Sequence, residues 1–222
     1  MDKPNFIPLP KRPDISDSVL LRKAIEFREI MIRWRTVRHF SDRPVAREVI
    51  EECLHVAGSA PSGANRQPWH FVAVSDATLK HEIRLAAEEE EREFYQHHPR
   101  KEWLEALAPI GTDSRKPFLE IAPWLIAIFA QPYQILPDGR KMRHYYATES
   151  VGIATGFLAA AIHQAGLASL TQTPSPMAFL NRILKRPASE KPFLLLVGGR
   201  PAENATVPDI HRKPLDAISP FV

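Results

Sequence analysis

The sequence has a single cysteine, Cys53, among its 222 residues, so no disulfide can form within the chain. Such sparse use of cysteine is typical of a reducing compartment, and we expect a cytoplasmic protein. Long apolar runs are also missing, since the longest strongly apolar runs cover only residues 122–130 and 193–197. A membrane-spanning helix needs about 20 apolar residues, and a secretion signal needs an apolar stretch near its start. The sequence has neither feature, so we expect no membrane partner.

Motifs of several common enzyme classes are missing as well. There is no GxGxxG or GxxxxGK(S/T) loop, which argues against the usual dinucleotide-binding and NTP-binding turns. There is no GxSxG turn, so Ser62 is a poor candidate for a hydrolase nucleophile. The chain lacks HExxH and a pair of cysteines, so no metal site is expected. The formal net charge is +3 without any basic tract, so nucleic-acid binding is not expected either.

What is present indicates one globular domain over residues 1–222, with 44% hydrophobic and 25% charged residues. Repeated prolines predict extended arms over residues 1–14 and 207–222. Between the arms, apolar periodicity and turn residues predict helices over 16–34, 78–95, 145–165 and 177–184, a helix that starts at Pro44, and strands over 70–74, 124–130, 170–171 and 193–197. These elements follow no regular βαβ rhythm, so we expect an α+β sandwich.

The predicted helix over 145–165 is apolar nearly all round, which predicts burial on all sides. Gly152, Gly156 and Ala160 recur every four residues along it and would let another backbone approach closely. This helix is either the centre of a monomer's core or packs against the second chain of a dimer. The sequence leaves both readings open.

Residues 35–40 (RTVRHF) could bind an anion. Arg35 and Arg38 are three positions apart with Thr36 between them, and guanidinium groups suit the oxygens of a phosphate. Taken alone, the same pattern fits the solvated end of a helix.

Residues 60–71 (APSGANRQPWHF) could approach a flat ligand. Gly63 allows close approach of the backbone, and Ser62 and Asn65 offer hydrogen bonds. Taken alone, this segment is a loop that enters a strand.

Together, the two segments resemble the FMN-binding signature of the nitroreductase superfamily. The resemblance runs from about residue 29 to residue 218 and is nearer to iodotyrosine deiodinases than to general nitroreductases. It implies a nitroreductase-like α+β sandwich, with a central mixed or antiparallel sheet flanked by helices, in an intertwined homodimer. It also implies an FMN cofactor held by Arg35, Thr36, Arg38, Ser62, Gly63, Asn65, Thr171, Thr173 and Arg212.

Two later motifs extend the resemblance. Residues 205–216 (ATVPDIHRKPLD) look like the family's closing motif, which implies Arg212 as a ligand of the flavin phosphate. Residues 171–174 (TQTP) correspond to the family's Thr-rich turn. There Thr173, with Thr171 as the alternative, would donate to flavin N5 and act as the catalytic residue. The middle position, Gln172, departs from the family pattern, and its contact is left open.

The resemblance further implies a substrate clamp in a lid over residues 91–116. Glu91 and Tyr95 are four positions apart, so a helix places them on one face. Glu91 can pair with the ammonium of an amino acid, while Lys116 and Tyr95 can meet its carboxylate. The backbone of Ala64 would bond the phenolate oxygen. The alternative is that Glu91 merely ends an acidic, solvated run and that Lys116 is on the surface.

The function we expect is FMN-dependent reductive dehalogenation of halotyrosines. Reduced flavin would supply the electrons, with NAD(P)H or a reductase as their source. Two alternatives stay open, a broad-specificity NAD(P)H-dependent nitroreductase or quinone reductase and a flavoprotein that binds tyrosine-like ligands without turnover. The clamp residues and Thr173 favour the dehalogenase.

Overall fold

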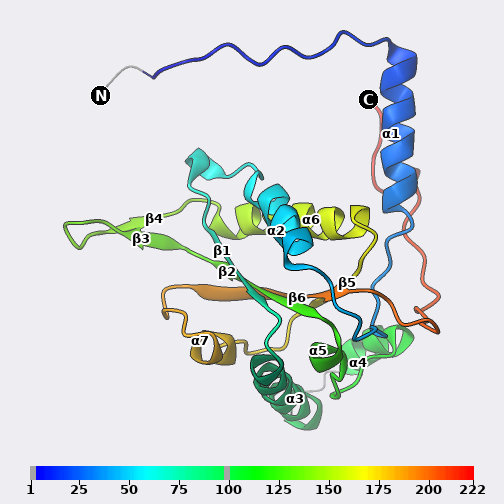
Figure 1. Cartoon of the computed structure of the whole chain (residues 1–222), viewed down its shortest axis with the longest axis vertical. Coiled ribbons are helices and arrows are strands. Elements are labelled where there is room, and N and C mark those ends of the chain that lie inside the picture. Colours follow the sequence, from blue (N-terminus) through cyan, green and yellow to red (C-terminus); the bar gives the residue numbers. More distant parts are fainter. Residues whose placement is uncertain (1–3, 98–100) are drawn as a thin grey trace. The chain divides into compact units, whose positions relative to one another are not determined.

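The computed structural model describes residues 4–97 and 101–222, so the start of the predicted N-terminal arm and residues 98–100 of the predicted lid lie outside the described residues (Figure 1). The chain divides into a unit over Met1–Trp34 and a unit over Arg35–Val222. In the first unit, residues 4–16 form neither helix nor strand, and α1 spans Asp17–Met31. No residue of α1 is buried, although its sequence includes several large apolar side chains.

The second unit is built on a four-stranded antiparallel sheet in the order β1-β2-β6-β5. The strands are β1 (Trp69–Val74), β2 (Trp124–Ala130), β5 (Ala168–Gln172) and β6 (Lys191–Gly199). Every residue of β2 is buried, as expected for a continuous apolar strand that is covered on both faces. Alternate side chains of β2 therefore belong to two separate cores, Leu125 and Phe129 to one and Ile126 and Ile128 to the other.

Helices cover both faces of the sheet (Figure 1). One core contains side chains of α2 (Arg47–Gly58) and α6 (Ala147–Gln164), which pack against each other. The opposite core contains side chains of α3 (Ala77–His97), α5 (Phe118–Ile121) and α7 (Phe179–Ile183). The predicted α+β sandwich is thus confirmed, with an antiparallel sheet.

The sequence did not predict every element. A hairpin of β3 (Tyr133–Ile135) and β4 (Lys141–Arg143) projects from the sheet, and α4 (Lys101–Leu107) lies within the predicted lid. Within the single chain, the helix over 145–165 is not buried on all sides, which argues against the reading of a monomer's central core helix and leaves the dimer reading open. Ile153 and Phe157 of α6 are 44% and 39% exposed, because α2 and the sheet cover only part of its circumference.

The segment over residues 35–40 runs beside the edge strand β5. Thr36 forms an isolated parallel bridge with Ser169 of β5. The guanidinium of Arg35 donates a hydrogen bond to the carbonyl oxygen of Pro208, which ties the segment to the C-terminal stretch. The fold thereby brings the predicted arginine motif next to the strand that ends in the TQTP turn.

Candidate active site

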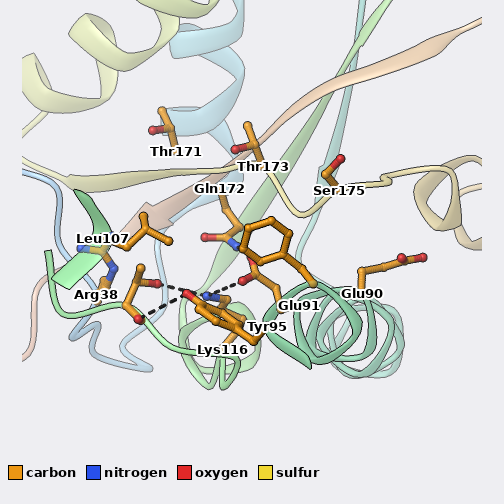
Figure 2. Close-up of a pocket in the computed structure, with 12 residues that line it drawn as sticks. Arg38, Glu90, Glu91, Tyr95, Leu107, Lys116, Thr171, Gln172, Thr173 and Ser175 are labelled. Carbon is orange, nitrogen blue, oxygen red and sulfur yellow. Dashed lines mark hydrogen bonds and ion pairs between the residues drawn. The ribbon is translucent and has the colours of Figure 1, made fainter. Parts of the chain in front are cut away.

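A pocket of about 210 Å³ lies among α3, the segment after α4 and the end of β5 (Figure 2). Charged, hydroxyl and aromatic side chains from distant parts of the sequence line it. They are Arg38, Glu90, Glu91, Phe94, Tyr95, Leu107, Thr112, Lys116, Thr171, Gln172, Thr173 and Ser175.

Lys116 is the most deeply buried charge of this pocket, with a side chain that is 1% exposed. Its Nζ lies 3.4 Å from Glu91 Oε2 and donates to Thr112 Oγ1 at 3.1 Å and to the carbonyl oxygen of Asp113. Burial lowers the pKa of Lys116 from its ordinary value of 10.5, and the nearby Glu91 carboxylate opposes that shift. The ammonium is therefore costly to hold here and depends on its acceptors.

Glu91 and Tyr95 project from one face of α3 toward Lys116 (Figure 2). The Tyr95 hydroxyl donates to the carbonyl oxygen of Thr112 at 3.4 Å. Burial, and then the charge of Glu91, raise the pKa of Tyr95, so its phenol keeps the proton with which it can donate. The alternative of a solvated Glu91 and a surface Lys116 is wrong, because their side chains are only 15% and 1% exposed.

Arg38 brings a second cation to the pocket. Its Nε and Nη1 are buried and have no hydrogen-bond partner within the described part of the chain. Burial lowers the pKa of Arg38, yet a guanidinium stays protonated in proteins, so these nitrogens need acceptors from outside the described residues. An anionic or carbonyl-bearing ligand would supply them.

The side chains of Thr171, Gln172 and Thr173 in the TQTP turn point alternately to the two sides of β5 (Figure 2). Thr171 and Thr173 are exposed on the side away from Lys116, so their hydroxyls are available to a ligand. Gln172 points the other way, toward Glu91, and its Nε2 donates to Glu91 Oε1 at 3.0 Å. The contact of Gln172, which the sequence left open, is therefore with Glu91.

The predicted flavin loop forms η1 (Gly63–Asn65) against the start of α6. A Cβ at position 63 would lie 2.8 Å from the carbonyl oxygen of Tyr145, so only glycine fits there without a shift. The Ser62 hydroxyl accepts a hydrogen bond from the backbone N–H of Gln67 at 2.9 Å and so braces the loop. Ala64 and Asn65 of η1 both adopt positive φ in this tight turn, and both residues are exposed.

The pocket unites only part of the predicted site. Arg38, Thr171, Thr173 and the three clamp residues line it, whereas Ser62, Gly63, Ala64 and Asn65 do not. η1 precedes β1 and α3 follows β1, so the two groups lie toward opposite ends of that strand (Figure 1). Arg35 and Thr36 lie along β5 outside the pocket, and Arg212 belongs to the exposed C-terminal stretch. Sequence reasoning missed Thr112 and Asp113, which hold Lys116 through a local turn that carries no motif.

The described residues include no cluster of three or more histidine, cysteine or acidic side chains that could hold a metal ion. None of the helices in that part of the chain is both long and apolar enough to cross a membrane.

Comparison with known proteins assigns the chain to a family. The family model described as "Nitroreductase family" matches residues 31–200. The chain therefore belongs to the nitroreductase family, as its motifs predicted. Within that family it belongs with the iodotyrosine deiodinases. The iodotyrosine deiodinase of Haliscomenobacter hydrossis is 54% identical over 216 residues, with 97% of each chain covered. Iodotyrosine deiodinase 1 of Homo sapiens is 43% identical over 200 residues, which are 90% of this chain and 69% of the human one.

Solved structures agree with this assignment. A crystal structure of oxidized iodotyrosine deiodinase, bound to FMN and 3-iodo-L-tyrosine, matches with a TM-score of 0.74 and 29% identity. The match covers 88% of this chain and all of that one. A BluB-like flavoprotein from Clostridium difficile 630 matches with a TM-score of 0.66 at 21% identity, which shows the shared fold alone.

Proposed function

We propose that this chain catalyses the FMN-dependent reductive dehalogenation of halotyrosines. The observation that carries the proposal is the buried Glu91–Lys116 pair beside Tyr95, in the same pocket as Arg38 and Thr173. Burying two opposite charges is costly, and a neutral flat acceptor would interact favourably with neither of them. The relatives named iodotyrosine deiodinase, and the solved one that holds FMN and 3-iodo-L-tyrosine, support the same function.

The clamp residues bind the amino-acid end of the substrate. The Glu91 carboxylate accepts hydrogen bonds from the substrate ammonium, while Lys116 and the Tyr95 hydroxyl donate to the substrate carboxylate. Lys116 also keeps Thr112 and Asp113 as acceptors, which hold its ammonium in place. The backbone N–H of Ala64 donates to the phenolate oxygen and fixes the orientation of the ring. The lid over residues 91–116 closes on the ligand and excludes water.

FMN fits the residues that this chain offers. Arg38 has two buried donors that need acceptors, and the hydroxyls of Thr171 and Thr173 are exposed. We assign the phosphate and ring polar atoms to Arg35, Thr36, Arg38, Ser62, Gly63, Asn65 and Arg212, and flavin N5 to Thr173 with Thr171 as the alternative. Reduced FMN supplies two electrons, which with one proton replace the carbon–halogen bond by carbon–hydrogen and release halide.

We propose that the site is completed in a homodimer. Ser62–Asn65 and the clamp lie apart within one chain, so one flavin needs a clamp from one copy and a loop from the other. Exposed apolar side chains on α6, together with Leu215, Ile218 and Phe221 in the C-terminal stretch, support a second chain as their partner. The electrons come from NAD(P)H or a separate reductase. The lone, buried Cys53 is compatible with a reducing compartment such as the cytoplasm.

An anaerobic titration tests the proposed function. The holoenzyme, with its flavin chemically reduced, is mixed with 3-iodotyrosine while flavin absorbance and free iodide are followed. We expect one iodide per reoxidised flavin and repeated turnover when reductant is added. Equal rates with iodophenol, and faster oxidation by nitroaromatics or quinones, would favour a broad-specificity reductase. A single oxidation without turnover would favour a binding protein.

A further inference from the structure

Gln172 contacts the clamp rather than the side of β5 where the threonine hydroxyls lie. Side chains alternate along a strand, so its neighbours Thr171 and Thr173 point to the opposite side (Figure 2). Gln172 is 8% exposed, and its Nε2 donates to Glu91 Oε1 at 3.0 Å, across 81 positions of sequence. The residue that departs from the Thr-rich pattern therefore touches the substrate-binding carboxylate.

The Glu91 carboxylate is held at both of its oxygens. Oε1 accepts from Gln172, and Oε2 faces Lys116 Nζ at 3.4 Å. Within the described residues these are the partners of the Glu91 side chain. Lys116 has further acceptors in Thr112 and Asp113, so its position does not depend on Glu91 alone. Glu91, in contrast, depends on Gln172 for its anchor to the sheet.

The anchor matters because glutamate has several rotatable bonds. A carboxylate on the surface of α3 that is held by one lysine can follow that lysine or turn toward water, and fixing it costs conformational entropy on binding. Gln172 belongs to β5, which pairs with β6 along its whole length. A hydrogen bond from a strand in the sheet orients the carboxylate before any ligand arrives, which lowers the cost of binding.

We propose that Gln172 is a positioning residue of the substrate clamp, which orients Glu91 so that its carboxylate meets the ammonium of the ligand. The inference rests on the proposed function, because it assigns Gln172 a role in halotyrosine binding. Gln172 acts through Glu91 and not on the carbon–halogen bond. Its loss should therefore raise the Kd and KM for halotyrosine and leave kcat nearly unchanged.

The test compares two matched variants of the FMN-loaded protein. Gln172→Met keeps the length of the side chain and removes its donor. Gln131→Met removes the same kind of bond elsewhere, since Gln131 Nε2 donates to Glu190 Oε1, also at 3.0 Å. We expect Gln172→Met to raise the Kd for iodotyrosine roughly tenfold, as for other bonds to charged groups, with kcat and iodophenol turnover within about twofold of wild type. Gln131→Met should leave all three values unchanged.

A double-variant cycle tests whether Gln172 acts through Glu91. In a Glu91→Leu background, Gln172→Met should change the Kd for iodotyrosine less than about twofold, because the bond is already gone. An equal tenfold loss in that background, an unchanged Kd in the single variant, or the same loss in Gln131→Met would each overturn the assignment. If wild type shows no preference for iodotyrosine over iodophenol, the proposed function fails instead, and the inference falls with it.

Discussion

The ammonium of Lys116 and the carboxylate of Glu91 lie 3.4 Å apart, and both side chains are largely shielded from solvent. Each charge therefore neutralises the other within the chain. A ligand with an ammonium and a carboxylate side by side can pair its ammonium with Glu91 and its carboxylate with Lys116, so no buried charge is left unpaired. A ligand with only one of these groups cannot.

Removing the charge of Glu91 should change the titration of Lys116. Burial lowers the pKa of Lys116 and Glu91 opposes that effect, so Glu91→Gln should lower the pKa further. The ammonium would then be lost at a lower pH, and halotyrosine binding would fall at a lower pH as well. Titration of the lysine ¹⁵Nζ signals by NMR measures the shift. Lys80 is the internal control and should titrate unchanged, because burial also lowers its pKa but the carboxylate that opposes the shift is Glu120 and not Glu91.

Arg38 should be needed to retain FMN. Arg38→Ala removes a cation whose Nε and Nη1 are buried without partners among the described residues, and a lost bond to a charged group costs about 1.5–3 kcal/mol. We expect FMN affinity to fall about ten- to a hundredfold. The ratio of flavin to protein after dialysis, with fluorescence titration of the apoprotein, gives the value. Arg43→Ala, at an exposed position, is the control, and equal flavin retention in both variants would remove Arg38 from the flavin site.

Gly63 should tolerate no side chain. In Gly63→Ala the new Cβ meets the carbonyl oxygen of Tyr145 at 2.8 Å, so the loop has to move. We expect a loss of about 1–3 kcal/mol in unfolding free energy, together with weaker FMN retention. Gly58→Ala is the matched control, because no atom outside its chain neighbours and the nearby backbone of its own helix lies within 4 Å of its Cβ position. Denaturant unfolding compares the two, and a wild-type-like Gly63→Ala would contradict a close-packed flavin loop.

The exposed face of α6 should carry the dimer contact. Phe157→Glu places a charge on an apolar surface that is accessible in the single chain, so it is tolerated unless a second chain covers it. We expect sedimentation to show a dimer for wild type and a monomer with reduced FMN content for Phe157→Glu. Leu85→Glu, on the exposed side of α3, should remain dimeric. A fully active wild-type monomer at micromolar concentration would contradict the shared site.

The sequence predicted those parts of the fold that local pattern determines. β2 has the predicted bounds, because a continuous apolar run marks a strand that is buried on both faces of the sheet. The β3–β4 hairpin was missed, since three-residue strands with mixed polar side chains give no clear alternation. The sequence left open what covers α6, because an apolar side chain looks the same in sequence whether the chain itself or a partner covers it.

For the site, motifs predicted the residue types, and the fold determined which of them meet. Glu91 and Lys116 were expected to converge, and they do. The bond between Gln172 and Glu91 could not be predicted, because it depends on how α3 packs beside β5 across a long separation in sequence. The separation between the Ser62–Asn65 loop and the clamp is likewise a property of the folded chain, and it is the reason why we propose that a second copy completes the site.

We propose that Glu91 and Lys116 recognise the zwitterion of a halotyrosine. The most direct measurement is the ratio of kcat/KM for iodotyrosine over iodophenol in wild type, Lys116→Gln and Glu91→Gln. Each variant keeps most of the side chain's size and removes one charge, at a cost of about 1.5–3 kcal/mol in binding. We predict that the ratio falls about ten- to a hundredfold in both variants, with iodophenol turnover nearly unchanged. A wild-type ratio in both variants would contradict the proposed role of Glu91 and Lys116 and favour a broad-specificity reductase.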